Sequence, residues 1–446
     1  MVPLHARALA PHLARRVRRR WDYALVAAAC ALPRLVAMLH EGSALLPAND
    51  SGVEKSDLLA RVFIKTGTFG YVPGEPSAYT QPLYGWFMIA IYWVAGRHWW
   101  SLGTVQVAVA VGTAILVYEI GRRFLSRRAG LIAALVSTLQ PYLIWHDVHA
   151  NREILDQILG AGMFLLVLLA TRHRSLRVPL ALGLVTGLAV LSNTRLLALP
   201  LAFAAYLLWR RAGWAAALVV VALAALTISP WIVRNKVEVG CWSITTDGRA
   251  FWKANNANTY ATLAAGLWID NVPDIPHRPP NPQDAYSDYT ENGINDYTQV
   301  NPAYAQAIPP KINECAQESY YTHLAVTFIE HHPGAKAKLM AQATKMLWDP
   351  SVTADGTTSS GGGLGSIKQV VEPAYVIALY LLAFVGLFFV ERAFAVLALG
   401  FLGYETLAAW VFAGTTRYRV PWDFVLALLA SAALARAPFR RRAPSQ

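Results

Sequence analysis

A series of long apolar runs, most of them ending in a cluster of arginine, constrains the fold of this chain more than any other feature. A helical run of about 18 or more apolar residues is long enough to cross the hydrocarbon core of a bilayer. Of the 446 residues, 55% are hydrophobic and 15% are charged, whereas soluble domains average about 25% charged residues. The sequence therefore predicts an α-helical polytopic membrane protein. The expected spans are residues 23–40, 102–121, 129–145, 154–171, 178–193, 196–209, 213–233, 371–390, 393–412 and 420–436.

The first apolar run follows a basic segment that contains Arg15 to Arg20. A cleaved signal peptide has a shorter apolar region and a small-residue cleavage site, whereas this run is long enough to span a membrane. We therefore expect an uncleaved first helix. The net charge of +12 comes from basic residues at the ends of apolar runs. This placement indicates membrane topology and leaves nucleic-acid binding as a weak alternative.

The segment "PLYGWFMIAIYWVAG" (82–96) decides which side of the membrane each loop faces. It is short, begins with proline and is rich in tryptophan and tyrosine, which favour the membrane interface. When it is not counted as a span, the basic clusters all fall on one side, as the positive-inside rule requires. We therefore predict ten spans, cytoplasmic termini, and a re-entrant or surface-lying helix at 82–96.

This topology divides the chain into three regions. They are an N-terminal transmembrane module at 1–233 with an outer loop at 41–81 and the juxtamembrane helix 82–96, an extracytoplasmic domain of mixed structure at 234–370, and C-terminal transmembrane helices with a basic tail at 371–446. An extracytoplasmic location is compatible with a disulfide between Cys241 and Cys315 without requiring one.

The outer face also collects charged side chains that topology does not explain. In "ANDSGVEKSDLLARVF" (48–63), Asp50, Glu54 and Asp57 lie at i, i+4 and i+7, on one face of an expected helix. Each alone is typical of a solvated helix face, but three carboxylates at a membrane interface are costly and favour a functional role as a set.

Four segments, in order along nearly the whole chain, carry a resemblance to a known family. They are "LLARVFIKTGTFGYVPGEPSAYTQPLYGWFMIAIYWVAG", "HANREILDQILG", "SPWIVRNKVEVGCWSITTDGRAFWKANNANTYA" and "GTTRYRVPWDFVLALLA". Together they resemble bacterial membrane glycosyltransferases of the GT-C fold, in the group of protein O-mannosyltransferases, aminoarabinose transferases and glycosyltransferase family 39. The order of the four segments makes the resemblance stronger than any one of them.

The resemblance implies that a sugar moves from a polyprenyl-phosphate carrier to an acceptor glycan, lipid or protein. It places this reaction on the extracytoplasmic face of the bacterial cytoplasmic membrane, among membrane lipids and without nucleic acid. It implies no cofactor apart from the lipid-linked donor. His146, Asp147 and His149 lack a spacing peculiar to a metal site, so no metal is expected.

Such a reaction needs a base for the acceptor hydroxyl and cationic groups for the departing phosphate. For the base we rank Asp50 first, Glu54 second and Asp57 third; Gly52 stands where the family carries its acid. For the phosphate we nominate Arg195, Arg417 and Arg419, because the planar guanidinium matches phosphate oxygens and arginine on the outer face opposes the positive-inside bias. The alternative for the "RYR" motif is an ordinary interface anchor. The residues expected to orient the substrates are Asp147, Glu153 and Tyr418.

Three other functions compete with sugar transfer from a monosaccharide donor. A lipid-linked polysaccharide polymerase or ligase also uses outer-face arginine, but the acidic first loop argues against it. A transporter would carry more ionisable residues within its spans and a visible repeat; Asp156 and Glu405 are the main acids within the expected spans. A non-catalytic assembly protein would not explain the acidic loop, the arginine motif and the interfacial helix together.

Overall fold

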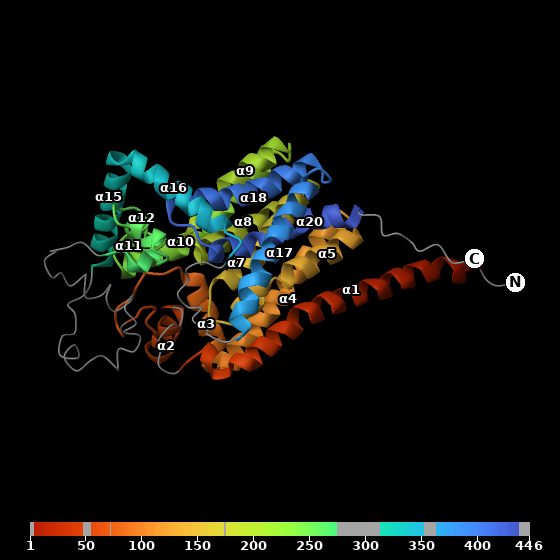
Figure 1. Cartoon of the computed structure of the whole chain (residues 1–446), viewed down its shortest axis with the longest axis horizontal. Helices are drawn as coiled ribbons and strands as arrows, with labels where there is room; N and C mark the ends of the chain where they lie inside the picture. Colours follow the sequence, from red (N-terminus) through yellow and green to blue (C-terminus); the bar gives the residue numbers. More distant parts are fainter. Residues whose placement is uncertain are drawn as a thin grey trace.

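The computed structural model describes residues 4–47, 55–71, 73–173, 175–273, 313–351 and 363–436. These residues are almost entirely helical and contain no β-strand (Figure 1). The helices of the main bundle are α1 (Leu4–Glu41), α4 (Trp99–Phe124), α5 (Arg127–Thr138), α7 (Glu153–Ala170), α8 (Arg177–Ser192), α9 (Leu199–Trp209), α10 (Trp214–Glu238), α17 (Gly363–Leu387), α18 (Arg392–Val411) and α20 (Asp423–Arg436). This arrangement confirms the predicted helical membrane architecture.

Seven helices in the described part of the chain are long and apolar enough to cross a membrane. They correspond to seven of the ten predicted spans. Two further predicted spans, 178–193 and 196–209, form shorter apolar helices, and the total of ten stays a prediction. The expected span 129–145 divides at Gln140, whose backbone is extended, into α5 and α6 (Pro141–His146). Proline at the first position of α6 explains the division, because its ring prevents a continuous helix.

Glycine brings two helices of the bundle into direct backbone contact. A Cβ atom at Gly187 of α8 would lie 2.6 Å from Cβ of Thr227 and 2.9 Å from the carbonyl oxygen of Ala224, both on α10. A Cβ atom at Gly183, one turn earlier, would lie 2.9 Å from the carbonyl oxygen of Val220. Small residues permit such close packing where the surrounding lipid offers no hydrophobic driving force. Helices α8 and α10 therefore form a tightly packed pair beside the site.

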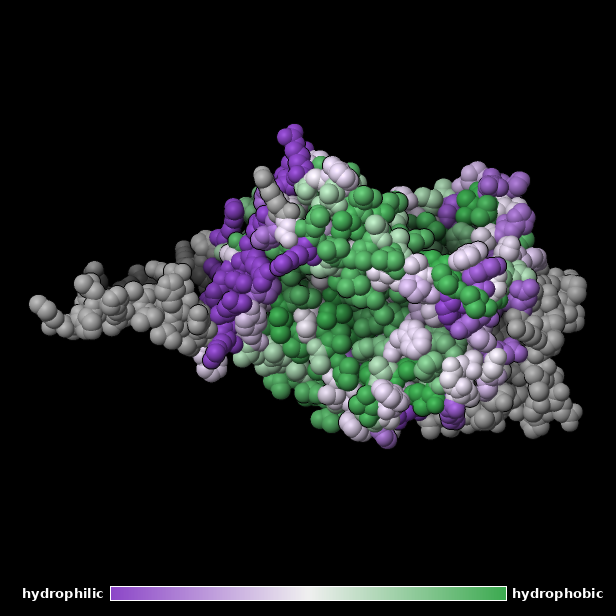
Figure 2. All heavy atoms as spheres, turned by 180° about the vertical axis from the view of Figure 1, so that it is seen from behind, coloured by the Kyte–Doolittle hydropathy of each residue, from purple (hydrophilic) through white to green (hydrophobic). Residues whose placement is uncertain are grey.

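The basic residues gather at one end of the bundle. Arg127 pairs with Asp22 of α1 at 2.5 Å, and Arg122 pairs with Glu119 at 2.7 Å. The ends of other helices meet nearby, where Arg172, Arg210 and Glu391 line one small cavity. On the face seen in Figure 2, apolar residues form a band between hydrophilic residues at the two ends. The predicted clustering of basic residues is therefore present, and the assignment of this end to the cytoplasm stays a prediction.

The helices at the opposite end are mostly short. They are η1 (Gly42–Leu45), α2 (Lys55–Thr66), α3 (Pro82–Ala95), η2 (Thr194–Leu196), α11 (Gly248–Lys253), α12 (Thr259–Ala264), η3 (Ile269–Asn271), α15 (Glu314–His331), α16 (Pro333–Trp348), α19 (Thr416–Arg419) and η4 (Val420–Trp422). The exceptions are the longer helices α15 and α16. In Figure 1, helices α11, α12, α15 and α16 form a separate group beside the bundle. A disulfide joins Cys241, after α10, to Cys315 at the start of α15, with 5.7 Å between the Cα atoms.

Helix α16 attaches this group to the bundle through hydrogen bonds with α18. The Lys336 ammonium donates to the carbonyl oxygen of Trp410 at 2.5 Å, and the Trp410 indole donates to the Thr344 hydroxyl at 2.7 Å. The Trp348 indole donates to the Thr406 hydroxyl at 3.1 Å. The group was expected to be of mixed structure; its described residues are helical, residues 274–312 lie outside the description, and the three-region division stays a prediction.

Candidate functional site

Four chain segments meet at the end of the bundle that lies opposite the basic clusters. They are the turn before α3, the loop between α6 and α7, the turn after α8, and the segment 412–419 before α20. The turn after α8 is built by Asn193, whose side-chain oxygen accepts a hydrogen bond from the backbone N–H of Arg195 at 3.2 Å. Asn193 thus ends one helix and begins the next, which places the Arg195 side chain at the site.

Glu153 and Arg417 form a two-bond ion pair at the centre of the site. The Arg417 Nε atom lies 2.7 Å from Oε1 of Glu153, and its Nη2 atom lies 3.1 Å from Oε2. The Glu153 side chain is only 1% exposed, whereas that of Arg417 is 29% exposed. His146 Nε2 lies 3.7 Å and Arg152 Nε lies 3.9 Å from the same carboxylate. Glu153 is therefore surrounded by three basic side chains, and it orients at least one of them by a fork-shaped contact.

Arg195 is held by different contacts. Its guanidinium carbon lies 3.7 Å from the centre of the Tyr418 ring and 5.3 Å from that of Phe412. Its Nη1 atom donates a hydrogen bond to the carbonyl oxygen of Ala413 at 3.2 Å. Among the described residues, no carboxylate forms an ion pair with Arg195. Arg195 is thus a fixed, half-buried cation whose charge is not neutralised by a partner.

Arg417 and Arg419 differ although only Tyr418 separates them. The Arg419 side chain is 1% exposed, and its Nε atom lies 3.2 Å from Oδ1 of Asp423. Its Nη1 atom donates to the carbonyl oxygen of Asp349 at 2.8 Å and to that of Leu347 at 3.1 Å. These bonds tie the end of α16 to α20, so the geometry favours a structural role for Arg419. Its predicted role as a phosphate ligand stays a prediction.

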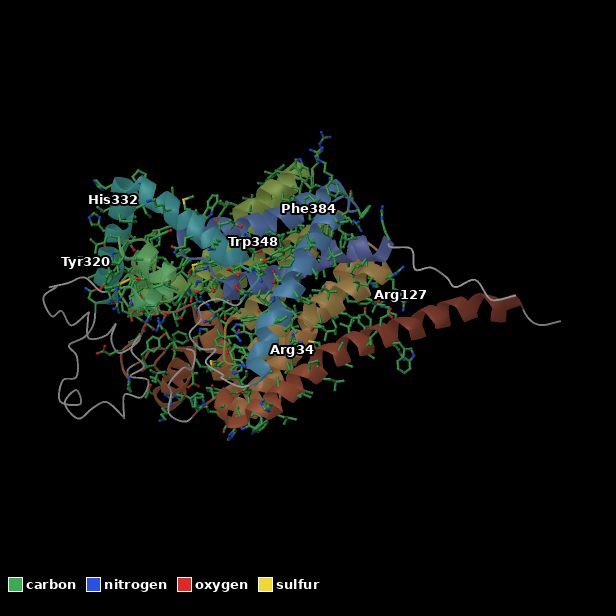
Figure 3. All side chains as sticks on the ribbon, viewed as in Figure 1. Arg34, Arg127, Tyr320, His332, Trp348 and Phe384 are labelled. Carbon is green, nitrogen blue, oxygen red and sulfur yellow. A yellow bond between two sulfur atoms is a disulfide. The ribbon has the colours of Figure 1, made fainter. Side chains whose placement is uncertain are left out.

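Asp147, an expected substrate-orienting residue, is fully buried among protein partners. Its Oδ2 atom accepts a hydrogen bond from Arg34 Nε at 2.8 Å, and Oδ1 accepts one from Gln157 at 2.7 Å. Sequence reasoning missed Arg34, which is 1% exposed. The signal was present, because Arg34 is a charged residue inside the first expected span, where such residues are rare and usually paired. Figure 3 shows Arg34 toward the site end of α1 and Arg127 at the basic end.

Of the three carboxylates in the acidic first loop, the structure describes only Asp57. It is 2% exposed, lies 2.8 Å from Arg97 Nη2, and accepts a hydrogen bond from the Tyr92 hydroxyl at 2.6 Å. Burial and the neighbouring carboxylate raise the pKa of Tyr92, which therefore stays a neutral donor. These contacts favour a role for Asp57 in fixing α2 against α3. Asp50 and Glu54 lie outside the described residues, so all three assignments as base stay predictions.

The described ends of the acidic loop are both attached to the region around α3. The carbonyl oxygen of Pro47 accepts a hydrogen bond from Arg97 Nη2 at 3.0 Å. The ammonium of Lys55 lies 4.9 Å from the centre of the Tyr79 ring. Two residues after Tyr79, the Gln81 side chain accepts a hydrogen bond from Arg152. A short path of contacts therefore joins the end of the acidic loop to the arginine residues of the site.

An apolar groove between α9 and α18 leads away from the site along the bundle. It has a volume of about 280 Å³, and its lining includes Leu199, Phe203, Phe401 and Tyr404. The Tyr404 hydroxyl donates a hydrogen bond to the carbonyl oxygen of Arg195 at 2.7 Å. One end of the groove therefore lies beside Arg195. The sequence did not identify this groove, because it depends on how two helices pack.

Two buried acids, Asp156 and Glu405, lie close to residues that contact Arg195 or neighbour it in the chain. The Asp156 carboxylate accepts hydrogen bonds from Ser192 and Asn193, each at 3.0 Å, and so fixes the turn after α8. Glu405 follows Tyr404 on α18, is 4% exposed, and has one carboxylate oxygen without a hydrogen-bond partner. Within the described ranges, no group of three or more His, Cys, Asp or Glu side chains is arranged to hold a metal ion.

Comparisons with known proteins agree with this architecture. Residues 75–233, which contain Arg152, Glu153 and Arg195, match the family described as dolichyl-phosphate-mannose-protein mannosyltransferase. A comparison with curated proteins gives no match. Archaeal oligosaccharyltransferase AglB from Archaeoglobus fulgidus, in complex with an inhibitory peptide and a dolichol-phosphate, aligns over 94% of this chain and 50% of its own at 14% identity, with a TM-score of 0.50.

The apo form of the Archaeoglobus fulgidus oligosaccharyltransferase aligns over 93% of this chain and 50% of its own, at 15% identity and a TM-score of 0.52. ArnT from Cupriavidus metallidurans bound to undecaprenyl phosphate aligns over 91% of this chain and 77% of its own, at 15% identity; its TM-score of 0.39 supports no structural argument. The chain thus spans about half the length of the oligosaccharyltransferases that it matches. The prediction of a GT-C fold is therefore confirmed. Residues 75–233 resemble the mannosyltransferase family.

Proposed function

We propose that this protein is a membrane glycosyltransferase, which moves a sugar from a polyprenyl-phosphate carrier to an acceptor hydroxyl at the site end of the bundle. The observation that carries the proposal is the position of Arg195. Its guanidinium is fixed by Tyr418 and Ala413 and lacks an ion-pair partner within the described chain, and its backbone carbonyl oxygen is bonded to Tyr404 in the lining of an apolar groove. A cation at the mouth of such a groove suits a phosphate attached to a long hydrocarbon chain.

In the proposed reaction, the acceptor oxygen attacks the anomeric carbon of the sugar, and the bond between that carbon and the phosphate oxygen breaks. The phosphate leaves on its lipid with the electron pair of that bond. Arg195 stabilises the negative charge that grows on the phosphate, and the partly buried surroundings strengthen this interaction. One displacement of this kind inverts the configuration at the anomeric carbon.

The remaining groups have separate tasks. Glu153 holds Arg417 in one orientation, and Arg417, whose side chain is 29% exposed, supplies a second cation. A carboxylate of the acidic loop, Asp50 or Glu54, takes the proton of the acceptor hydroxyl. No step requires a metal or a cofactor. We place the reaction on the extracytoplasmic face of a bacterial cytoplasmic membrane, where the Cys241–Cys315 disulfide would persist.

The groove offers a direct test of the proposal with a matched control. Gly400 lines the groove, and Gly403 on the same helix does not; a Cβ atom at either glycine would meet nothing within 4 Å. Gly400→Leu therefore fills the groove without an internal clash, whereas Gly403→Leu adds the same side chain elsewhere on α18. The proteins are purified into nanodiscs and incubated with a panel of radiolabelled polyprenyl-phosphate sugars.

We expect the unmodified protein and Gly403→Leu to consume one donor of the panel. Gly400→Leu should consume it at least about tenfold more slowly, with the loss mainly in KM because the lipid loses its binding surface. Equal rates for the two leucine variants would exclude the groove as the lipid site. Consumption of no monosaccharide donor, together with turnover of a lipid-diphosphate oligosaccharide, would instead favour a polymerase or ligase.

A further inference from the structure

A second groove lies outside the bundle, between α12 and α16, and the proposed reaction does not yet use it. Its volume is about 520 Å³, and its lining includes Tyr260, Lys338, Gln342 and Lys345. Helix α16, which forms one wall, runs from His332 at the outer edge of the molecule to Trp348 against the bundle (Figure 3). The groove therefore follows a helix that leads toward the site.

The groove carries a net positive charge. Lys338 and Lys345 lie two turns apart on the same face of α16, about 10 Å along its axis. Both are exposed, and neither has an ion-pair or hydrogen-bond partner among the described residues. Lys336 has a different task, because it is partly buried and bonds to Asn255 and Trp410. The one carboxylate in the lining, Asp349, accepts hydrogen bonds from Ser351.

The groove also offers contacts suited to a sugar. Tyr260 is 49% exposed, and its ring presents an apolar face of the kind on which sugar rings stack. The Gln342 side chain donates to the carbonyl oxygen of Tyr260 at 3.1 Å and so fixes Tyr260 beside α16.

The inner end of the groove reaches the segment that holds the arginine residues of the site. Asp349 lines the groove, and its carbonyl oxygen accepts a hydrogen bond from Arg419 at 2.8 Å. Met346, also in the lining, packs against a cluster that contains Ala413, the residue whose carbonyl oxygen holds Arg195. A molecule lying in the groove would thus end next to the proposed donor site.

We infer that this groove binds the acceptor, and that the acceptor is an anionic oligosaccharide, with carboxylate or phosphate groups that contact Lys338 and Lys345. The inference rests on the proposed glycosyltransferase function and names its acceptor class. Two lysine side chains without partners among the described residues match a repeating negative charge, and the exposed Tyr260 ring matches a sugar ring between those charges. A free glycan and the glycan part of a lipid present the same chemistry to the groove.

Binding is tested without any donor, so that its outcome does not depend on catalysis. The full-length protein in nanodiscs is titrated with an oligogalacturonate hexamer, with maltohexaose as a neutral probe of equal length, and with an acidic hexapeptide. The test variant is Lys338→Gln with Lys345→Gln. The control is Lys65→Gln with Lys236→Gln, which removes the same charge from exposed lysines away from the groove.

We expect the acidic hexamer to bind at least about tenfold more tightly than maltohexaose, with affinity that falls as salt rises. The lysine pair in the groove should account for most of this difference, and the control pair for little of it. Equal affinity of the two hexamers, or equal effects of the two variants, would overturn the inference. Tighter binding of the acidic peptide than of the acidic glycan would assign the groove to a protein acceptor.

A transfer assay separates failure of this inference from failure of the proposed function. With the labelled donor present, the acidic glycan should receive label, and the groove variant should raise KM for the acceptor more than it lowers kcat. Donor consumption without any preference for the acidic glycan would reject the acceptor class while keeping the glycosyltransferase. A lack of donor consumption, with binding intact, would reject the enzyme while keeping the groove. A lipid-linked form of the same glycan distinguishes the two sources of acceptor by which of them is labelled.

Discussion

The two ends of the helix bundle both concentrate arginine, but they hold it in different surroundings. At the basic end, the Arg127 and Arg123 side chains are 47% and 40% exposed, and each pairs with one carboxylate. At the site end, Arg34 and Arg419 are 1% exposed, and their carboxylate partners are at most 3% exposed. The arginine side chains are therefore roughly half exposed at one end and fully buried at the other, although the carboxylate partners at the basic end, Asp22 and Glu119, are only 6% and 7% exposed.

This difference in burial indicates which ion pairs stabilise the fold. Exposed pairs are screened by solvent and salt and contribute little, typically about 0–1 kcal/mol. In a buried pair the desolvation cost is already present, so removal of one partner leaves an unpaired charge and costs about 3–5 kcal/mol. The buried arginine pairs at the site end therefore stabilise the fold, and Arg195, which has no ion pair among the described residues, is left for the proposed chemistry.

The strongest test of this contrast removes one member of the buried Arg34–Asp147 pair. Asp147→Asn should leave the Arg34 charge unpaired and destabilise the protein by about 3–5 kcal/mol. We expect little monodisperse protein on size-exclusion chromatography in detergent and a much lower thermal midpoint. Arg123→Gln, at the basic end, is the matched control and should change the midpoint only slightly, because the Arg123 side chain is 40% exposed and its partner Glu119 keeps the ion pair with Arg122.

A double variant shows whether Asp147 also touches substrate. Arg34→Met with Asp147→Leu removes both charges and should recover most of the lost stability, because two apolar side chains replace a buried pair. If Asp147 is structural, the recovered protein should also transfer sugar. If the double variant is stable but does not transfer sugar, Asp147 contacts substrate, as the sequence predicted.

The second test compares arginine residues within the site end. Arg195→Gln should lower kcat by about 100-fold to 1,000-fold, because the departing phosphate loses its charge stabilisation, while stability changes little since Arg195 has no ion pair in the described structure. Arg419→Gln should do the reverse and mainly lower the thermal midpoint. Steady-state kinetics and thermal unfolding of both variants check the contrast, which an unchanged kcat in Arg195→Gln would contradict.

The smallest expected effect concerns pH and the attachment of α16. Burial lowers the pKa of Lys336 to about 8, from an ordinary value of 10.5. Between these two values the unfolded chain binds more protons than the folded protein, so folded stability rises with pH through this window. The midpoint of the unmodified protein minus that of Lys336→Met should therefore increase from pH 7 to pH 9.5. Lys338→Met, at an exposed position, should show no such trend.

Much of the fold could be predicted because apolar length and arginine placement are local properties of the sequence. They predicted the helical membrane class and the grouping of basic residues. A helix at 82–96 was also predicted and is present as α3, whereas its re-entrant or surface-lying position stays a prediction. The division at Gln140 was also readable, since Pro141 lies within the expected span 129–145 and proline ends a helix before it. The boundary between the expected spans 178–193 and 196–209 was predicted and agrees with the end of α8 and the start of α9, whereas their crossing of the membrane stays a prediction.

The candidate site was predicted less completely, because charge and spacing do not reveal burial. Arg195, Arg417, Glu153 and Tyr418 were nominated, and the structure brings them together. Asp147 was nominated for the same reasons, yet its carboxylate is buried against Arg34, a residue 113 positions earlier. No local pattern distinguishes a carboxylate that faces a cavity from one that faces a distant arginine. The grooves, likewise, exist only once helices pack.

The separation of Arg34 from Asp147 also matters during synthesis of the chain. Arg34 and Asp147 are 113 positions apart. At an elongation rate of about 5–20 residues per second, Asp147 is synthesised roughly 6–20 seconds after Arg34. An arginine near the middle of a membrane helix costs about 2.5–3.5 kcal/mol while it is unpaired. The first helix therefore carries an unpaired charge in the membrane until the third expected span, 129–145, and Asp147 after it have been synthesised. The Arg34–Asp147 pair can therefore form only after residue 147 has been synthesised, and a chain that stopped before that residue would keep an unpaired arginine in its first helix.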